Sequence, residues 1–123
     1  MFGLYDIDSE EIKSAFDSLS PIFGFSPETP GLPRYENDYY HRKNPESLGN
    51  WWIITSLWLA QYYSMIDQPE RTVAVLHWVK QFAAQSGILP EQIDPGNGSF
   101  MSVAPLTWTH AEYLSTLLDT VQE

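Results

Sequence analysis

The 123-residue sequence contains no cysteine, which excludes disulfides, thiolate metal ligands and thiol nucleophiles. Basic residues are also scarce: six Lys and Arg stand against sixteen Asp and Glu, and the net charge is −10. That field repels phosphate backbones and anionic lipids, so we expect neither nucleic-acid nor membrane binding. No apolar run reaches the roughly 18 residues of a membrane span, and the first residues lack the basic region of a secretory signal. We therefore expect a cytoplasmic protein.

Aromatic residues, by contrast, are plentiful. They make up 15% of the chain, as five Trp, seven Tyr and six Phe. Aromatic rings bury large areas in a core, and they also supply flat faces on which sugar rings stack. Composition alone leaves both interpretations open. The length fits one domain, so we treat residues 1–123 as a single unit.

Apolar residues recur at helical spacing in four stretches. The first helix is expected to begin after Asp8 as N-cap and to end at Pro21 and Gly24. Its apolar stripe is Ile12, Ala15, Phe16 and Leu19. Residues 51–66 are apolar at nearly every position, which predicts a helix surrounded by protein.

Two amphipathic helices are expected to follow. Asp67 and Glu70 form a predicted capping box for the third helix, and Gly87 is expected to end it. Its predicted apolar face is Val75, Leu76, Val79, Phe82 and Ala83. Thr109 and Glu112 predict a second capping box, at the start of the last helix. The apolar stripe of this last helix is Ala111, Leu114, Leu117, Leu118 and Val121.

The pattern is all-α, with helices that are buried alternating with helices that are amphipathic. Such alternation favours the inner and outer helices of a barrel or toroid over a plain four-helix bundle. Two long loops interrupt it. Residues 21–49 hold five of the nine prolines, and residues 87–108 contain a tight turn around 94–98. Loops of this length in compact domains are usually functional or disordered.

Three sequence blocks in these regions form a recognisable set. Residues 31–40 read G-L-P-R-Y-E-N-D-Y-Y and residues 50–53 read N-W-W-I. The third block, residues 87–112, begins with G-I-L-P-E-Q at 87–92 and contains P-L-T-W-T-H-A at 105–111. In this order the blocks resemble the glucoamylase-like enzymes of glycoside hydrolase family 15. The resemblance implies an (α/α)6 toroid of twelve helices, of which this chain would form the C-terminal third.

The resemblance also implies roles for individual residues. Glu91 matches the general base, and Arg34 matches an arginine that holds sugar hydroxyls. His110 is expected to support the site by hydrogen bonding, without touching the sugar. The residues expected to bind substrate are Arg34, Tyr35, Tyr40, Trp52, Gln92 and Trp108. The loop 21–49 would then face the sugar, and the loop 87–108 would carry the base.

Simpler roles stay open for several of these residues. Arg34 could form a salt bridge with Glu36 or Asp38, and Trp52 and Trp108 could serve only as core. The three histidines are far apart in sequence and show no metal-binding spacing, so no metal or cofactor is expected.

The general acid of the family lies on an earlier segment, and no motif here resembles it. The resemblance therefore implies half of an inverting site for α-glucan oligosaccharides such as maltooligosaccharides, inactive or nearly so alone. A companion polypeptide would supply the rest of the barrel. Two alternatives are a non-catalytic helical module that forms homo-oligomers or docks to a partner, and a sugar-binding remnant without turnover. Glucodextranase-like and trehalase-like substrates also stay open.

Overall fold

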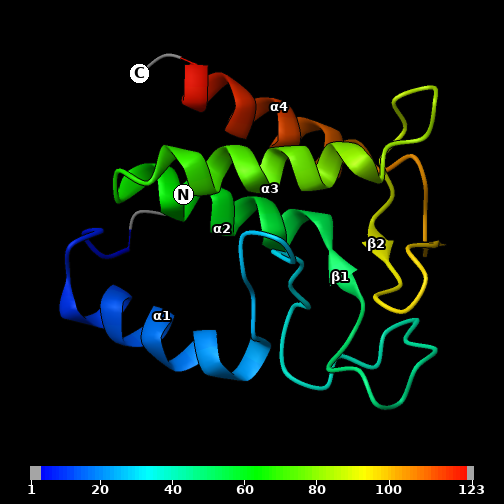
Figure 1. Ribbon diagram of the computed structural model, residues 1–123, viewed down its shortest axis with the longest axis horizontal. Helices are drawn as coiled ribbons and strands as arrows, with labels where there is room; N and C mark the ends of the chain where they lie inside the picture. The colour runs from blue at the N-terminus through cyan, green and yellow to red at the C-terminus, as the bar shows by residue number, and fades with distance from the viewer. Residues whose placement is uncertain (1–3, 122–123) are drawn as a thin grey trace.

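The computed structural model describes residues 4–121 and is mostly helical, with four helices and a small sheet (Figure 1). Its elements, in chain order, are α1 (Glu10–Phe23), β1 (Trp51–Trp52), α2 (Ile53–Met65), α3 (Pro69–Gln81), β2 (Gln92–Ile93), β3 (Phe100–Met101) and α4 (Thr107–Val121). α2 packs against both α3 and α4, and α1 lies along the opposite side of the molecule from α4 (Figure 1). The predicted all-α class with four helices, the architecture of one third of a helical toroid, is confirmed.

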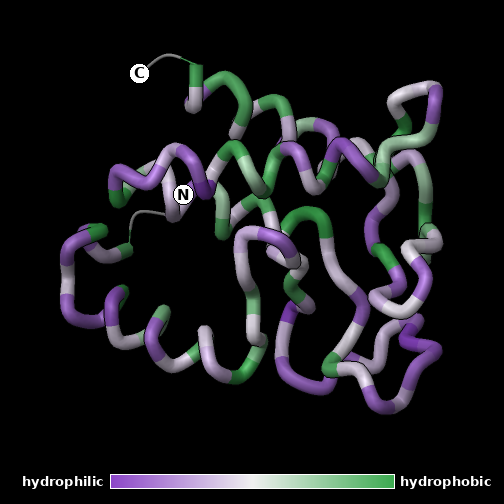
Figure 2. The backbone as a smooth tube through the Cα atoms, in the orientation of Figure 1, coloured by the Kyte–Doolittle hydropathy of each residue, from purple (hydrophilic) through white to green (hydrophobic). Residues whose placement is uncertain are grey.

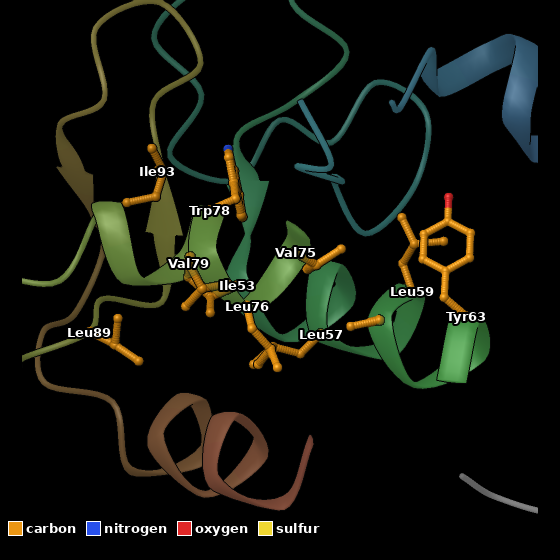
Figure 3. Packing of buried hydrophobic residues seen from close by; sticks show 11 residues of the cluster. Ile53, Leu57, Leu59, Tyr63, Val75, Leu76, Trp78, Val79, Leu89 and Ile93 are labelled. Atoms are coloured by element: carbon orange, nitrogen blue, oxygen red, sulfur yellow. The ribbon is translucent and has the colours of Figure 1, made fainter. Parts of the chain in front are cut away.

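The core is centred on α2, as its apolar sequence predicts. Ile53, Leu57 and Ala60 are completely buried. Val75 and Val79 of α3 pack against them, and Leu89 and Ile93 extend the cluster toward the sheet (Figure 3). Burying such side chains contributes roughly 1.5–3 kcal/mol each. This cluster fixes the N-terminal end of α2, which directly follows β1.

The three-stranded sheet was not predicted. It is antiparallel in the order β1-β2-β3, with Trp52 opposite Gln92 and Gln92 opposite Met101. Trp51 and Trp52 therefore lie in a strand, and the predicted helix 51–66 begins only at Ile53. The reason is that their backbone groups pair outside the helix: the Trp52 amide donates to the Leu32 carbonyl at 2.8 Å.

Gly24 ends α1 as predicted, but the predicted starts of the first and third helices are wrong in detail. Ser9, not Asp8, caps α1, accepting a hydrogen bond from the Ile12 amide. α1 also continues through Pro21 to Phe23, and the helix forgoes the backbone hydrogen bond that the proline nitrogen cannot donate. Asp67 has a φ of 57° and lies outside α3, whose N-cap is Gln68 without a side-chain bond.

Gly87 and the last helix also differ from expectation. α3 ends at Gln81. Gly87 instead closes a turn, in which its backbone amide donates a hydrogen bond to the Ala84 carbonyl. α4 begins at Thr107, so Thr109 lies inside the helix and forms no capping box with Glu112. Thr109 is completely buried, and its hydroxyl has no partner within residues 4–121.

The predicted stripe of α4 is only partly packed on this chain. Leu117 packs against the core cluster, but Leu114, Leu118 and Val121 are 56%, 54% and 69% exposed. α4 also has polar contacts with α2, where the Gln61 amide donates to Glu112 and Thr116 at 2.7 and 3.0 Å. Hydrophobic segments recur along the exposed turns of α4 (Figure 2). The helix thus carries apolar side chains that no residue in the range 4–121 covers.

α1 has a similar character. None of its residues is fully buried, and Leu19 and Ile22 are 46% and 44% exposed. It is attached mainly through Phe16, whose ring stacks on Tyr62 with centroids 4.7 Å apart. The molecule therefore has partly uncovered apolar helices on two opposite flanks (Figure 1).

Candidate functional site

The small sheet brings the three sequence blocks together. Leu32 of the first block pairs with Trp52 of the second in an isolated bridge, and the Thr55 hydroxyl donates to the Leu32 carbonyl at 2.8 Å. The third block joins where the Ile53 amide donates to the Glu91 carbonyl at 3.2 Å. Residues that are 20 to 60 positions apart in the sequence thus meet at the beginning of α2.

Arg34 lies at the centre of this meeting point. Its Nε and Nη2 donate to the two oxygens of Asp38 at 2.8 and 2.9 Å. The guanidinium carbon lies 4.1 Å from the Trp52 ring centroid, 5.1 Å from that of Tyr40 and 5.4 Å from that of Tyr35. The salt bridge to Asp38 considered from the sequence therefore exists, and the same guanidinium lies beside the aromatic rings. The Nη1 nitrogen donates to no acceptor within residues 4–121.

The Asp38 carboxylate is completely buried. Burial alone would raise the pKa of Asp38, but hydrogen bonds from Arg34 and from the Tyr40 amide, together with the arginine charge, hold that pKa below its ordinary value. In turn, the hydrogen bonds to Asp38 raise the pKa of Arg34, and the charges of Asp38 and Glu91 add to the effect. Arg34 is thus fully charged and lies within the electrostatic reach of Glu91.

This pKa shift predicts acid sensitivity. Because the folded-state pKa of Asp38 lies below its unfolded value of about 3.9, the carboxylate stabilises the fold above that pH and loses its effect as the pH falls through the folded pKa. Urea unfolding at several pH values should show Asp38→Asn less stable than the wild type at pH 6, with the gap closing below about pH 4. A gap that stays constant down to about pH 2 would contradict this assignment.

Glu91 is held through its backbone and its side chain. Its amide donates to the Val103 carbonyl at 2.9 Å, and its Oε2 accepts from the Gln92 amide at 3.0 Å. The side chain is half-buried. A carboxylate that is held on one oxygen and still reached by solvent can take a proton from water.

A hollow of about 340 Å³ adjoins Arg34. The residues that line it are Arg34, Trp52, Ile54, Thr55, Trp58 and Trp108. Trp108 is 53% exposed, so it is not a core residue of this chain, whereas Trp52 is buried. The indole nitrogen of Trp52 is buried without a hydrogen-bond partner within the described residues. The hollow therefore has aromatic walls and a cation.

Trp58 was missed from the sequence. Its ring lies 6.1 Å from that of Trp108. It also lines a second hollow of about 440 Å³, between α1 and the loop that carries Arg34. Trp58 lies in a helix that is apolar at nearly every position. The sequence pattern therefore does not distinguish a side chain that lines a hollow from one that packs in the core.

Five predicted site residues do not line this hollow: Tyr35, Tyr40, Glu91, Gln92 and His110. Gln92 is completely buried, and its amide contacts Glu91 and Asn50. His110 accepts a hydrogen bond from the Leu89 amide at its Nε2, 3.1 Å away, beside a different hollow that includes Tyr113. Within residues 4–121, no cluster of three or more His, Asp or Glu could hold a metal ion. No helix in that range is long and apolar enough to cross a membrane.

Comparison with known proteins gives consistent results. The sequence model of glycosyl hydrolases family 15 matches residues 70–118, a range that includes Glu91 and Trp108. An uncharacterized glycosyl hydrolase of Methanocaldococcus jannaschii is 29% identical over 126 residues, which cover 92% of this chain and 19% of that protein.

Solved structures show the same fold. A wild-type glycosidase matches 98% of this chain with a TM-score of 0.77 and 21% sequence identity, and a glycosidase variant in complex with glucose matches equally well at 20% identity. The chain covers 33% of each of these chains. At such identities the likeness shows the fold alone.

Fold and matches together define a glycosidase-like helical protein. The predicted resemblance to glycoside hydrolase family 15 is confirmed: the chain is similar to a segment of such a hydrolase and spans 33% of the solved glycosidases.

Proposed function

We propose that this chain carries the general-base half of an inverting, glucoamylase-like site for α-linked glucose oligosaccharides. The observation that carries the proposal is the small sheet, which sets Glu91 beside the Arg34 and Trp52 cluster. The family match over Glu91 and Trp108 supports it. A neutral sugar is also compatible with the net charge of −10, because it is not repelled by that field.

The roles follow from the chemistry of each group. Glu91 removes a proton from the water that attacks the anomeric carbon. Arg34 donates to sugar hydroxyls, since its Nη1 is not engaged by Asp38. The rings that provide stacking faces or walls are Tyr35, Tyr40, Trp52, Trp58 and Trp108.

An inverting site also needs an acid, with its carboxyl group about 6.5–9.5 Å from the base. Among the described residues, those that line the hollow include no carboxyl group, and Glu91 itself lies outside this lining. The acid must then come from another part of the toroid, in keeping with a chain that spans 33% of the solved glycosidases. Without protonation of the leaving group most of the acid–base rate gain is lost, so we expect no measurable hydrolysis by the isolated chain.

Hydrolysis assays test this proposal. Maltose, maltotriose, isomaltose and trehalose would be offered to the isolated chain and to the complete two-part enzyme, the chain combined with the remainder of its toroid. We expect only the complete enzyme to hydrolyse the maltooligosaccharides, releasing β-glucose, as observed by proton NMR before mutarotation. Release of α-glucose would contradict inversion. Cleavage of trehalose or isomaltose alone would contradict the substrate class.

A second candidate function is docking, to a companion polypeptide or to further copies of the chain. The exposed Leu114, Leu118 and Val121 on α4 favour it. The total accessible surface of 7410 Å² also exceeds the about 6700 Å² typical of a monomer of this mass. Exposed apolar faces of this kind are usually covered by another element.

This candidate predicts concentration-dependent association. Sedimentation velocity should show oligomers of the wild-type chain at high concentration, and Leu114→Ser with Leu118→Ser should shift it to monomer without lowering its stability. Val73→Ser, at a residue 40% exposed on α3, is the matched control and should change nothing. A wild-type chain that is monomeric at every concentration would contradict self-association and leave the companion polypeptide as the proposed cover.

A further inference from the structure

A buried chain of hydrogen bonds leads from Asn50 to Glu91. The Asn50 Nδ2 donates to Gln92 Oε1 at 2.8 Å, and Gln92 Nε2 donates to Glu91 Oε2 at 3.0 Å. Asn50 is 1% exposed and Gln92 is completely buried. Amide groups buried to this extent are costly to place unless they are hydrogen-bonded. Their presence beside the proposed base therefore calls for a role.

The direction of this chain is fixed by chemistry. A carboxylate only accepts hydrogen bonds, so the NH2 group of Gln92 must face Glu91. Gln92 Oε1 then faces away and needs a donor, which the Asn50 amide provides. With Asn50 in place, only one orientation of the Gln92 side chain satisfies both neighbours.

The backbone keeps the three residues in register. Asn50 directly precedes β1, and Gln92 lies in β2 opposite Trp52. The Glu91 carbonyl is bound by the first amide of α2, that of Ile53. Neither the Asn50 nor the Gln92 side chain lines the hollow, and both are buried. The burial of Gln92 therefore argues against its predicted contact with sugar.

We propose that Asn50 is a positioning residue that acts through Gln92 on Glu91. Asn50 orients the Gln92 amide so that Gln92 donates to Glu91 Oε2. Glu91 Oε1 is then left as the oxygen that faces the attacking water. The inference rests on the proposed role of Glu91 as base. It assigns Gln92 to the support of that base.

The test is Asn50→Asp, a nearly isosteric change that removes the donor. A carboxylate at this position attracts the Gln92 NH2 group, so the amide turns and presents Oε1 to Glu91, which repels it. Asn44→Asp is the matched control, since Asn44 is exposed and uses only its Oδ1, to accept from the Glu46 amide.

Two readouts apply. In the isolated chain, NMR should show the Gln92 side-chain NH2 signals and the Glu91 side-chain carboxyl carbon shifting in Asn50→Asp and not in Asn44→Asp. In the complete two-part enzyme, kcat should fall roughly 10- to 100-fold while KM changes less than about twofold, because the base is misplaced and the sugar contacts are kept. Unchanged Gln92 signals, or an unchanged kcat, would overturn the proposal.

A second variant covers the case in which Asn50→Asp does not fold. Glu91→Ala removes the acceptor at a half-buried position, and the Gln92 NH2 signals should then move and exchange faster with water. Signals that do not respond would overturn the proposal. Its failure is separable from that of the proposed function: an enzyme insensitive to Glu91→Gln contradicts the base itself, whereas one sensitive to Glu91→Gln but not to Asn50→Asp contradicts only the positioning role.

Discussion

Replacing Glu91, the proposed base, with glutamine is expected to lower kcat of the complete two-part enzyme by about 10²- to 10⁴-fold, the usual contribution of a general base. The substituted amide keeps the shape of the side chain and can still accept the hydrogen bond from Gln92 Nε2. It cannot take a proton from water. KM for maltotriose should change little, because the sugar contacts are assigned to Arg34 and the aromatic rings.

The assay is release of glucose from maltotriose at saturating substrate. Glu46→Gln is the control: Glu46 is exposed and, within residues 4–121, only its backbone amide forms a hydrogen bond, to Asn44, so activity should stay at the wild-type level. Circular dichroism and thermal unfolding would confirm that both variants fold. Full activity of Glu91→Gln would show that another group is the base.

Replacing Gly31 with alanine is expected to destabilise the chain by about 2–3 kcal/mol, toward the upper end for an overpacked site. A Cβ at this position would lie 2.4 Å from the Trp51 side chain. The Trp51 ring cannot move away easily, because it packs edge-on against Trp78 and Phe82. The new methyl group would therefore push the Leu32 segment off β1.

Urea unfolding measures this effect. Gly96→Ala is the matched control, because its Cβ meets only an Asp94 carboxylate oxygen at 3.3 Å, and it should cost less than about 1 kcal/mol. Gly31→Ala should also disturb NMR signals of Arg34, which follows Leu32 closely in the chain. Equal stability of the two variants would contradict the close packing of Gly31 on Trp51.

The helices could be predicted from the sequence, but the sheet could not. The buried face of α3 and the nearly uniform burial of α2 follow from apolar spacing, which is the strongest local signal. Strands of two residues, such as Trp51–Trp52 and Gln92–Ile93, are too short to show alternation. Their pairing is a contact between distant segments, so local pattern carries no record of it.

Helix ends were predicted less well for a different reason. Asp8 and Ser9 are both good N-caps, and the choice depends on which side chain reaches the Ile12 amide. The stripe of α4 was identified correctly as apolar, but it was expected to pack. Leu117 does pack against the core, but Leu114 and Leu118 stay exposed, because polar contacts such as that of Gln61 with Thr116 take up part of the face that α4 turns to α2. Periodicity reveals a face and not what covers it.

The candidate site, too, could be predicted only in part from the sequence. The sequence blocks indicated Glu91, Arg34, Trp52 and Trp108 as candidates, and the sheet brings the segments of the first three together. The blocks did not show that Gln92 is buried behind Glu91, since an amide next to a base is equally compatible with contacting sugar or supporting the base. That distinction depends on Asn50, 42 positions away in the sequence.

The most direct test of the central claim, that the three blocks form one sugar-facing surface, is an NMR titration of this chain with maltotriose. We expect saturable shifts of the Arg34 Nε–H and of the Trp58 and Trp108 indole signals, together with the Glu91 backbone amide, and none at Tyr113, which lines a different hollow. Shifts that are confined to the surroundings of Tyr113, or the absence of any shift at high millimolar maltotriose, would contradict the account.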